Sequence, residues 1–447
     1  MIPAIPRQRV RLGDVADLLT GFPFRSSEYT TGDGVRLLRG DNVAQGRLRW
    51  DEAKLWPLGL VSDVKNYALA EHDVVVAMDR PWIEAGLKYA AVQRHDLPCL
   101  LVQRVARLRA TNGTVQRFLK YLIGSRRFTE HVLGVQTGTA VPHISGGQIR
   151  EFSFDLPPLA EQKAIASILG TLDDKIELNR RMNETLEDLA RTIFKSWFVD
   201  FDPVRAKAEG RQPVGIGSET AALFPSRFVQ SELGKIPEGW RVTRLADLTS
   251  KIGSGATPRG GSAVYVDDGV SLIRSQNVYD RRFDWGGLVK LPDWAAEELR
   301  GVTVEAHDVL INITGDSILR TCVVDPTVLP ARVNQHVSIV RAASGIPPRF
   351  LHEHLLLPRT KDWFLGLDTG GTRKAITKGH LESLQLVVPP ATVLRSFEAA
   401  TTSLYHRTIV NSGESKTLAE LRDLLLPKLI SGELRVPDAE KLIEAAL

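Results

Sequence analysis

The chain has 447 residues, of which 43% are hydrophobic and 25% charged, a composition typical of a globular protein with room for two to four domains. No apolar run approaches the roughly 20 residues that cross a bilayer, and the N-terminal stretch lacks the apolar region of a signal peptide, so we expect a cytoplasmic protein. Two cysteines, Cys99 and Cys322, do not indicate a disulfide framework or a cysteine-based zinc site, and we expect both to be buried.

The net charge of +4 is distributed unevenly along the chain. Residues 1–155 carry +5 and residues 240–390 carry +2, whereas the remaining segments together carry −3. In the first of these segments the positive charge is mostly arginine, which suits bidentate contacts with phosphate and guanine. The charge therefore favours a nucleic-acid ligand, with a mixed solvated surface as the alternative interpretation.

The first half of the chain recurs in the second half, shifted by about 232 residues. The matching segments are Leu37–Val43 with Leu272–Val278, Glu71–Val74 with Ala306–Val309, Gln136–Ile144 with Asp368–Ile376, and Leu156–Pro158 with Val388–Pro390. A repeat this long indicates two related domains rather than a solenoid. Two similar domains suit a ligand with two similar sites, of which double-stranded nucleic acid is the commonest.

In chain order, residues 1–156 are predicted to form a first mixed α/β domain. Buried strands are expected at 74–78 and 100–105, and a helical segment at 116–133. The equivalent strands at 309–313 and 337–340, with a helical segment at 350–367, belong to a second domain, 240–390. Both domains should share one fold.

Each domain is followed by a long amphipathic helix. The region 157–199 contains a helix from 160 to about 198 with apolar residues at alternating spacings of three and four, and the C-terminal region 391–447 repeats this scheme. Asn179 and its repeat equivalent Asn411 occupy positions where the spacing calls for an apolar residue. A polar residue at one such position fixes helix register at a cost in stability.

The segment 200–239 is rich in proline, glycine and charge and has no clear periodicity, so it is predicted to be an ordered linker or loop. The chain is therefore predicted to have an α/β (mixed α+β) fold, with two similar globular domains joined by two long helices. Because the second helix can bury its apolar stripe only by returning along the first, we expect an antiparallel coiled coil and a pseudo-twofold internal repeat. Two helices packed separately on their own domains are the alternative.

The usual catalytic constellations are absent from the sequence. Gly253–Pro258 has the glycines of a phosphate loop but no following lysine, and the Pro-Pro pairs at 157–158 and 389–390 lack the neighbours of an amino-methyltransferase motif. The histidines show no HExxH pairing, and no metal site is expected. The sequence favours a binding protein without catalytic residues of its own.

Two sets of polar residues are candidate DNA contacts. The first comprises arginines and amides suited to reading base edges: Arg36, Arg39, Asn42, Gln45, Arg47 and Arg49, and in the second copy Arg274, Gln276, Asn277, Arg281 and Arg282. The second comprises residues of paired glycine-rich loops suited to phosphate contacts: Thr137, Thr139 and His143, with Thr372, Arg373 and Lys374. An exposed polar surface or a structural turn is the alternative for each.

Five segments of the chain resemble the specificity subunit of type I restriction-modification systems. They are Leu156–Ala166, Leu172–Asn179, Trp197–Val204, Leu233–Trp240 and Leu425–Leu434. The second copy departs from this pattern at Ala391–Leu394, which leaves the start of its helix less securely placed.

The resemblance implies two target-recognition domains, each reading one half of a bipartite DNA site, and helices that set the spacing and dock other subunits. It implies as partners double-stranded DNA, two modification (methyltransferase) subunits and a restriction (translocase/endonuclease) subunit, with no membrane. S-adenosylmethionine, ATP and Mg are then expected on the partner subunits and none on this chain.

Two other functions remain open at this point. A self-contained DNA methyltransferase would bind S-adenosylmethionine as purified chain alone. A coiled-coil protein-binding scaffold would show no sequence-selective shift of DNA in the presence of its partners.

Overall fold

The computed structural model describes residues 7–50, 53–83, 86–111, 113–138, 141–367 and 375–446, and it forms two compact units. Unit 1 comprises Met1–Asn179 with Gly413–Leu447, and unit 2 comprises Arg180–Ser412. The unit boundaries fall inside the two long helices rather than at their ends. Each unit therefore contains one α/β domain and one half of each long helix.

Unit 1 is built on two sheets. Its five-stranded sheet has the order β2 (Ala16–Thr20), β11 (Val105–Ala110), β6 (Val74–Ala77), β9 (Tyr89–Ala91) and β4 (Gln45–Gly46). Its three-stranded sheet has the order β10 (Cys99–Leu101), β3 (Gly34–Leu38) and β5 (Lys54–Pro57). Strand β1 (Gln8–Arg11) pairs antiparallel with β12 (Ser153–Leu156), so the domain begins and ends on adjacent strands.

Unit 2 repeats this plan. Its sheets have the orders β16 (Thr249–Ser254), β25 (Val337–Ala342), β22 (Val309–Asn312), β23 (Thr321–Val323), and β20 (Val289–Leu291), β17 (Val270–Ile273), β24 (Ala331–Val333), β21 (Thr303–Val304). Strand β15 (Arg241–Arg244) pairs with β26 (Gln385–Val388) as β1 pairs with β12. The prediction that both copies share one fold is confirmed.

The predicted helical segment of each domain is two helices rather than one. In unit 1 these are α2 (Gln116–Ile123) and α3 (Arg126–Val135), and in unit 2 they are α9 (Pro348–Leu356) and α10 (Pro358–Gly366). Ser125 separates the first pair because its hydroxyl accepts a hydrogen bond from the Phe128 amide and so begins a new helix. Pro358 does the same for the second pair, since a proline lacks the amide that a continuous helix needs.

The predicted strand at 100–105 is likewise divided. It contributes to β10 and β11, which lie in different sheets. Arg104 between them has φ 67°, a left-handed conformation that interrupts the strand. The sequence is apolar on both sides of the break because the part in β10 and the part in β11 are both buried.

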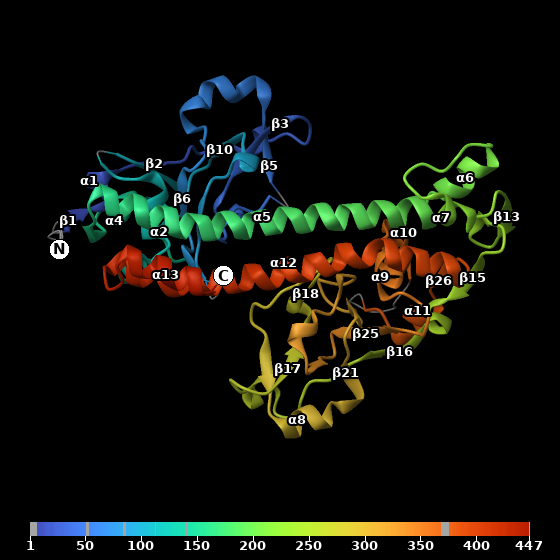
Figure 1. Cartoon of the computed structure of the whole chain (residues 1–447). Helices are drawn as coiled ribbons and strands as arrows, with labels where there is room; N and C mark the ends of the chain where they lie inside the picture. The colour runs from blue at the N-terminus through green and yellow to red at the C-terminus, as the bar shows by residue number, and fades with distance from the viewer. Residues whose placement is uncertain are drawn as a thin grey trace. The chain divides into compact units, whose positions relative to one another are not determined.

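The long helices are α5 (Leu159–Phe198) and α12 (Ala391–Ser431), so the second begins at the position that the sequence left insecure. Within unit 1, Asp173 pairs with Arg422 and Lys175 with Glu414, which means that the two halves run antiparallel (Figure 1). Within unit 2, Asn183 binds the Thr408 carbonyl while Phe198 packs on Phe397, which gives the same direction. The predicted antiparallel pairing is confirmed in each unit.

The two asparagines predicted to set the register are fully buried in this pairing. Asn179 Nδ2 lies 2.8 Å from Glu414 Oε2, and Asn411 Nδ2 lies 2.8 Å from Asn183 Oδ1. Their role in register stays a prediction. Leu189, one of the apolar residues at this spacing on α5, is 49% exposed.

The connector 200–239 has more structure than predicted. It contains α6 (Asp202–Ala208), α7 (Ser218–Ala222) and a hairpin of β13 (Phe228–Ser231) and β14 (Gly234–Pro237). Large side chains of this segment enter the hydrophobic core of unit 2: Phe201, Val204, Phe224 and Ile236. The connector is therefore an integral part of unit 2, and it lacks periodicity because its elements are too short to show one.

Both cysteines are buried and unpaired, as predicted. Among the described residues, no helix is long and apolar enough to span a membrane.

Candidate nucleic-acid interface

The turn that follows β3 in unit 1 is closed by Asn42, and the same turn in unit 2 is closed by Asn277. The amide of Arg39 donates to Asn42 Oδ1 at 3.0 Å, and Asn42 Nδ2 donates to the Arg49 carbonyl at 2.9 Å. Asn277 makes the same bonds, accepting from the Arg274 amide at 3.0 Å and donating to the Asp284 carbonyl at 2.9 Å. Both side chains are buried and used within their turns, so neither remains a candidate for reading a base.

Two candidate arginines also have internal roles. Arg36 Nη2 donates to the carbonyls of His95 and Leu97 at 2.9 and 3.2 Å, and its guanidinium lies 4.6 Å from the centre of the Trp50 ring. Arg281 forms an ion pair with Glu353, whose side chain is 2% exposed. Removing Arg281 would leave the buried Glu353 charge uncompensated, so this ion pair has a structural role. The contacts of Arg36 with main-chain carbonyls and with Trp50 are likewise internal to the domain.

The other turn residues present their side chains to solvent to different degrees. Arg39 pairs with Asp41 at 3.3 Å and Arg282 with Asp284 at 3.4 Å, each arginine being about half exposed. Arg274 donates to the Gly287 carbonyl and is half-buried. The exposed members of the predicted set are Gln45, Arg47, Arg49, Gln276 and Arg282.

The glycine-rich loop of unit 1 lies at the carboxyl end of β6. Thr137 and His143 exchange main-chain hydrogen bonds of 2.9 and 2.8 Å, and the Thr137 hydroxyl lies 3.2 Å from His143 Nε2. Gly138 permits this turn with φ 91°, where an added Cβ would lie 2.6 Å from the Val141 carbonyl oxygen. Thr139 lies outside the described residues.

The loop is tied to β6 by the Ile144 amide, which donates to the Met78 carbonyl at 2.9 Å. In unit 2 the Ile376 amide donates to the Ile313 carbonyl at 2.8 Å, so the second loop ends at the equivalent place after β22. Thr372, Arg373 and Lys374 lie outside the described residues.

A basic cluster in unit 1 joins the two predicted regions, and the sequence alone did not indicate it. Lys88 is 9% exposed, and burial lowers its pKa, with Arg49 and Arg80 lowering it further while Asp41 and Asp79 oppose them. The Arg80 amide donates to the Pro142 carbonyl of the glycine-rich loop at 2.7 Å. The structure therefore brings Arg49 and the loop before His143 into one neighbourhood, through Arg80 and Lys88.

Two features near this cluster fit contact with DNA. Arg80 has φ 43°, an uncommon conformation for a residue with a side chain, which points to a backbone held in place by its surroundings. The next residues form a short hairpin of β7 (Trp82–Ile83) and β8 (Gly86–Leu87), on which Trp82 is 41% exposed. Cations bind phosphates, and exposed aromatic side chains stack on bases or insert between them. The signal that could have revealed this site was Asp79–Trp82, where charged and aromatic residues directly follow a buried strand.

The equivalent loop of unit 2 carries different side chains. Between β22 and β23 lies Arg320, whose guanidinium is 4.7 Å from the centre of the Tyr279 ring, and Arg282 lies 4.9 Å from the same ring. Tyr279 is thus held between two arginines, one of them a predicted candidate. The two units offer different chemistry on the same framework.

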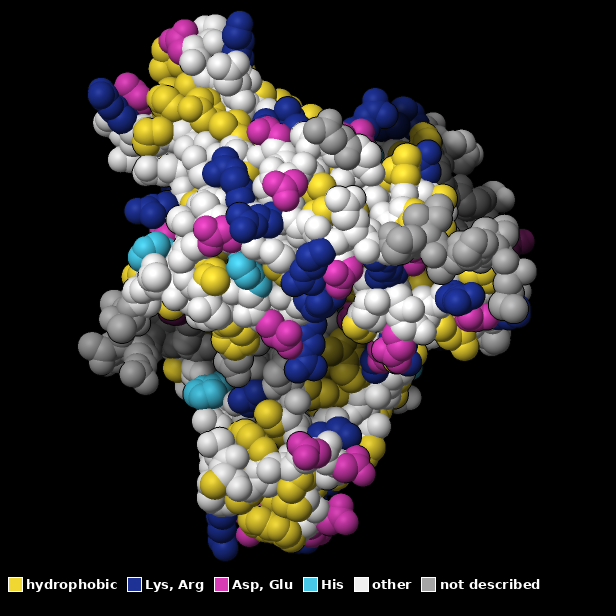
Figure 2. Space-filling view, turned by 90° about the vertical axis from the view of Figure 1, so that its left-hand side faces the viewer, with side chains coloured by type: hydrophobic (Ala, Val, Ile, Leu, Met, Phe, Trp, Pro, Cys, Tyr) yellow, Lys and Arg dark blue, Asp and Glu magenta, His cyan; other side chains and the backbone are white. Residues whose placement is uncertain are grey.

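Charges of both signs are mixed on the face of the molecule that Figure 2 presents. Lysine and arginine side chains are interspersed there with aspartate and glutamate. The candidate contact site in unit 1 is therefore argued from the cluster around Lys88.

These features define a class of protein: two related α/β domains, each with polar and aromatic loops at equivalent strand ends, attached to a pair of antiparallel helices. Residues 6–188 match the family model described as the type I restriction modification DNA specificity domain. Over this segment the chain is similar to the specificity proteins of type I restriction-modification systems.

Individual relatives agree with this assignment. The chain is 28% identical to the type I restriction enzyme HindI specificity subunit of Haemophilus influenzae, over 72% of this chain and 78% of the relative. It is 40% identical to the EcoAI specificity subunit of Escherichia coli over 36% of this chain and 27% of that protein. The crystal structure of the type I restriction-modification S subunit from M. genitalium has the same fold, with a TM-score of 0.53 at 15% identity, covering 96% of this chain and 97% of that one.

Proposed function

We propose that this chain is the DNA sequence-recognition subunit of a type I restriction-modification complex, in which each domain reads one half of a bipartite site. The observation that carries the proposal is the repeated framework with unlike loop side chains, added to the family match. The same turn is closed by Asn42 and by Asn277, yet the adjoining loops present Arg80 and Lys88 in unit 1 and Arg320 in unit 2. The same turn in both units, with different side chains in the adjoining loops, suits the reading of two different half-sites.

Recognition would divide between phosphate and base contacts. Lysine and arginine contacts with phosphates supply salt-dependent affinity and set the register of the protein on the duplex, while contacts with base edges select the sequence. Arg49 and Arg80 are exposed and are suited to the first task. Arg47, Gln276 and Arg282 are exposed side chains of the kinds that read guanine and adenine.

The helices α5 and α12 would set the spacing between half-sites and dock two modification subunits and a restriction subunit. The buried asparagines Asn179 and Asn411 would keep the helices in one register. Methylation, translocation and cleavage would belong to the partners, together with S-adenosylmethionine, ATP and Mg. This chain would then act without catalytic residues of its own.

Mapping of methylated bases in host DNA, with and without this gene, tests the proposal. We expect a single bipartite motif to lose its adenine methylation when the gene is deleted and to regain it when the gene is restored. A methylation pattern that does not change on deletion, while the modification subunits are still produced, would contradict the proposal. Methylation by the purified chain alone would instead identify a self-contained methyltransferase.

A further inference from the structure

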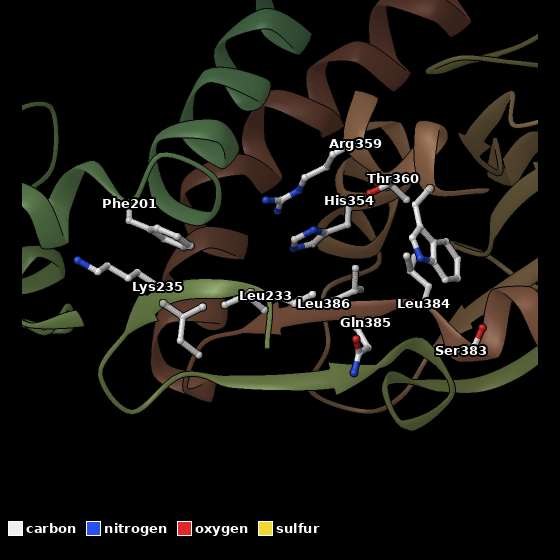
Figure 3. Close-up of a pocket in the computed structure, with 13 residues that line it drawn as sticks. Phe201, Leu233, Lys235, His354, Arg359, Thr360, Ser383, Leu384, Gln385 and Leu386 are labelled. Carbon is white, nitrogen blue, oxygen red and sulfur yellow. The ribbon is translucent and has the colours of Figure 1, made fainter. Parts of the chain in front are cut away.

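A cavity of about 240 Å³ opens in unit 2 where α9, α10, the β13–β14 hairpin and β26 meet. None of its 13 lining residues is aspartate or glutamate, whereas Arg359, Lys235 and His354 are among them. Figure 3 shows the Arg359 guanidinium and the His354 ring pointing into the same space, with Lys235 extending beside Phe201. The cavity therefore combines apolar walls with groups that bind anions.

At the equivalent place in unit 1, three phenylalanine rings pack together. Phe152 packs on Phe128 and on Phe154, with centroid distances of 5.1 and 5.7 Å, and all three rings are buried. The same shift of 232 residues places Thr360, Leu384 and Leu386 at these positions in unit 2. All three line the cavity, so side chains smaller than phenylalanine stand where unit 1 has three rings.

The repeat also shows a missing carboxylate. In unit 1, Arg127 pairs with Asp155 at 3.7 Å. Their equivalents in unit 2 are Arg359 and Val387, and among the described residues no acidic side chain pairs with Arg359. Arg359 is an exposed residue that also lines the cavity, and partial burial lowers the pKa of its guanidinium. A carboxylate in the cavity would form a charge-assisted hydrogen bond with it.

His354 supplies a second polar group. It replaces Leu122 of unit 1, it is fully buried, and within the described parts of the chain neither ring nitrogen has a hydrogen-bond partner. Phe194 and Phe350 pack edge-on against its ring at 4.9 and 4.6 Å, and burial lowers its pKa to about 3. A neutral histidine retains one N–H donor, and a buried donor without a partner is costly.

We propose that this cavity binds a carboxylate attached to an aromatic or bulky apolar group, with Arg359 holding the carboxylate and the space left by the missing rings holding the apolar group. The ligand would restore what unit 1 builds from its own phenylalanines and Asp155. Its source is either a free small acid or an acidic side chain of a partner protein.

Isothermal titration of the full chain with 3-phenylpropionate tests this proposal. We expect binding that is weaker by about tenfold or more for the neutral 3-phenylpropionamide, because a charge-assisted hydrogen bond is lost. Arg359→Gln should weaken 3-phenylpropionate binding to a similar degree, whereas Arg395→Gln, an exposed arginine on α12 outside the cavity, should not.

A refilling variant keeps the test independent of any loss of folding. Thr360→Phe should supply one of the rings that unit 1 has, and it should abolish binding while maintaining the melting temperature. Equal affinity of wild type and Thr360→Phe, or no binding of 3-phenylpropionate by wild type, would overturn the proposal. A capped, amidated peptide with adjacent phenylalanine and glutamate distinguishes the sources: tighter binding than 3-phenylpropionate supports a partner's side chain, and weaker binding supports a free acid.

Discussion

At the scale of single residues, the polar side chains near the proposed DNA-binding surface fall into two groups. Asn42, Asn277, Arg36 and Arg281 are used inside the domains, where they hold turns and strands in place. Others, such as Arg49, are exposed and lie near Arg80 and Lys88, which were not predicted to contact DNA. Residue type alone does not separate these groups because arginine and asparagine suit both tasks.

Arg49→Gln combined with Arg80→Gln should weaken DNA binding by the complex almost equally for the target sequence and for a mismatched one. Each lost phosphate contact lowers the dependence of log affinity on log salt by roughly 0.9, so the double variant should lose about two. Binding measured over a series of salt concentrations checks this. Arg126→Gln, an exposed arginine on α3 that pairs with Glu130, is the control and should behave as wild type. An unchanged salt dependence in the double variant would remove the cluster around Lys88 from the DNA interface.

At the scale of elements, a buried ion-pair network fastens both long helices to α2 in unit 1. Asp173 on α5 is bound by Lys120 and by the Tyr121 hydroxyl on α2, and by Arg422 on α12 at 2.8 Å. Burial by itself would raise the pKa of Asp173, but Lys120 and Arg422 outweigh it and hold the pKa below its ordinary value. The adjacent Asp174 is 60% exposed and forms its ion pair with Arg117 at 2.6 Å.

Asp173→Asn should therefore lower the free energy of unfolding by about 1.5–3 kcal/mol, because it leaves the half-buried Lys120 without its carboxylate and Arg422 with Asp423 alone. Asp174→Asn, the neighbouring control, should cost less than about 1 kcal/mol. Urea unfolding followed by circular dichroism checks both values, and equal losses in the two variants would contradict the assignment.

The stability that the Asp173 carboxylate contributes depends on pH. A carboxylate with a depressed pKa contributes stability above its unfolded pKa of about 3.9, and this contribution is lost as the pH falls through the folded value. The difference in stability between wild type and Asp173→Asn should accordingly persist at neutral pH and shrink below about pH 4.

At the scale of the whole molecule, each α/β domain begins and ends on two strands that pair with each other. Gln8 lies opposite Leu156 in the pairing of β1 with β12, and Arg241 lies opposite Val388 in the pairing of β15 with β26. A domain that begins and ends on neighbouring strands can be replaced without disturbing the helix that follows. Both helices nevertheless contribute to the core of each unit, for example Leu169 and Leu425 in unit 1.

Exchange of residues 9–155 for the recognition domain of a related protein should change only one half of the recognised DNA site. The physical reason is that the contacts proposed for the other half come from unit 2 alone. Mapping of methylated motifs for the exchanged and the parent protein provides the measurement. Changes in both halves would refute the modular interpretation, and exchange of the equivalent residues 241–388 should alter the opposite half.

The sequence by itself determined the duplication, the two long helices, their antiparallel pairing and the resemblance to type I specificity subunits. These follow from periodicity and from matching segments, which are local patterns that the chain displays directly. The break at Ser125 also had a local cause. The single strand predicted at 100–105 was wrong, and the ordered linker predicted at 200–239 contains short helices and a hairpin, because apolar runs and short elements do not reveal where one element ends.

Only the tertiary structure decided which polar side chains are structural and which face solvent. The partner of Arg281 is Glu353, 72 positions away, and that of Asp173 is Arg422, 249 positions away. It also showed that Thr360 and Val387, ordinary residues in the sequence, line a cavity at positions where unit 1 has Phe128 and Asp155. A side chain's role depends on the charge and volume of whatever packs against it, and in a folded chain those neighbours come from segments that no local pattern brings together.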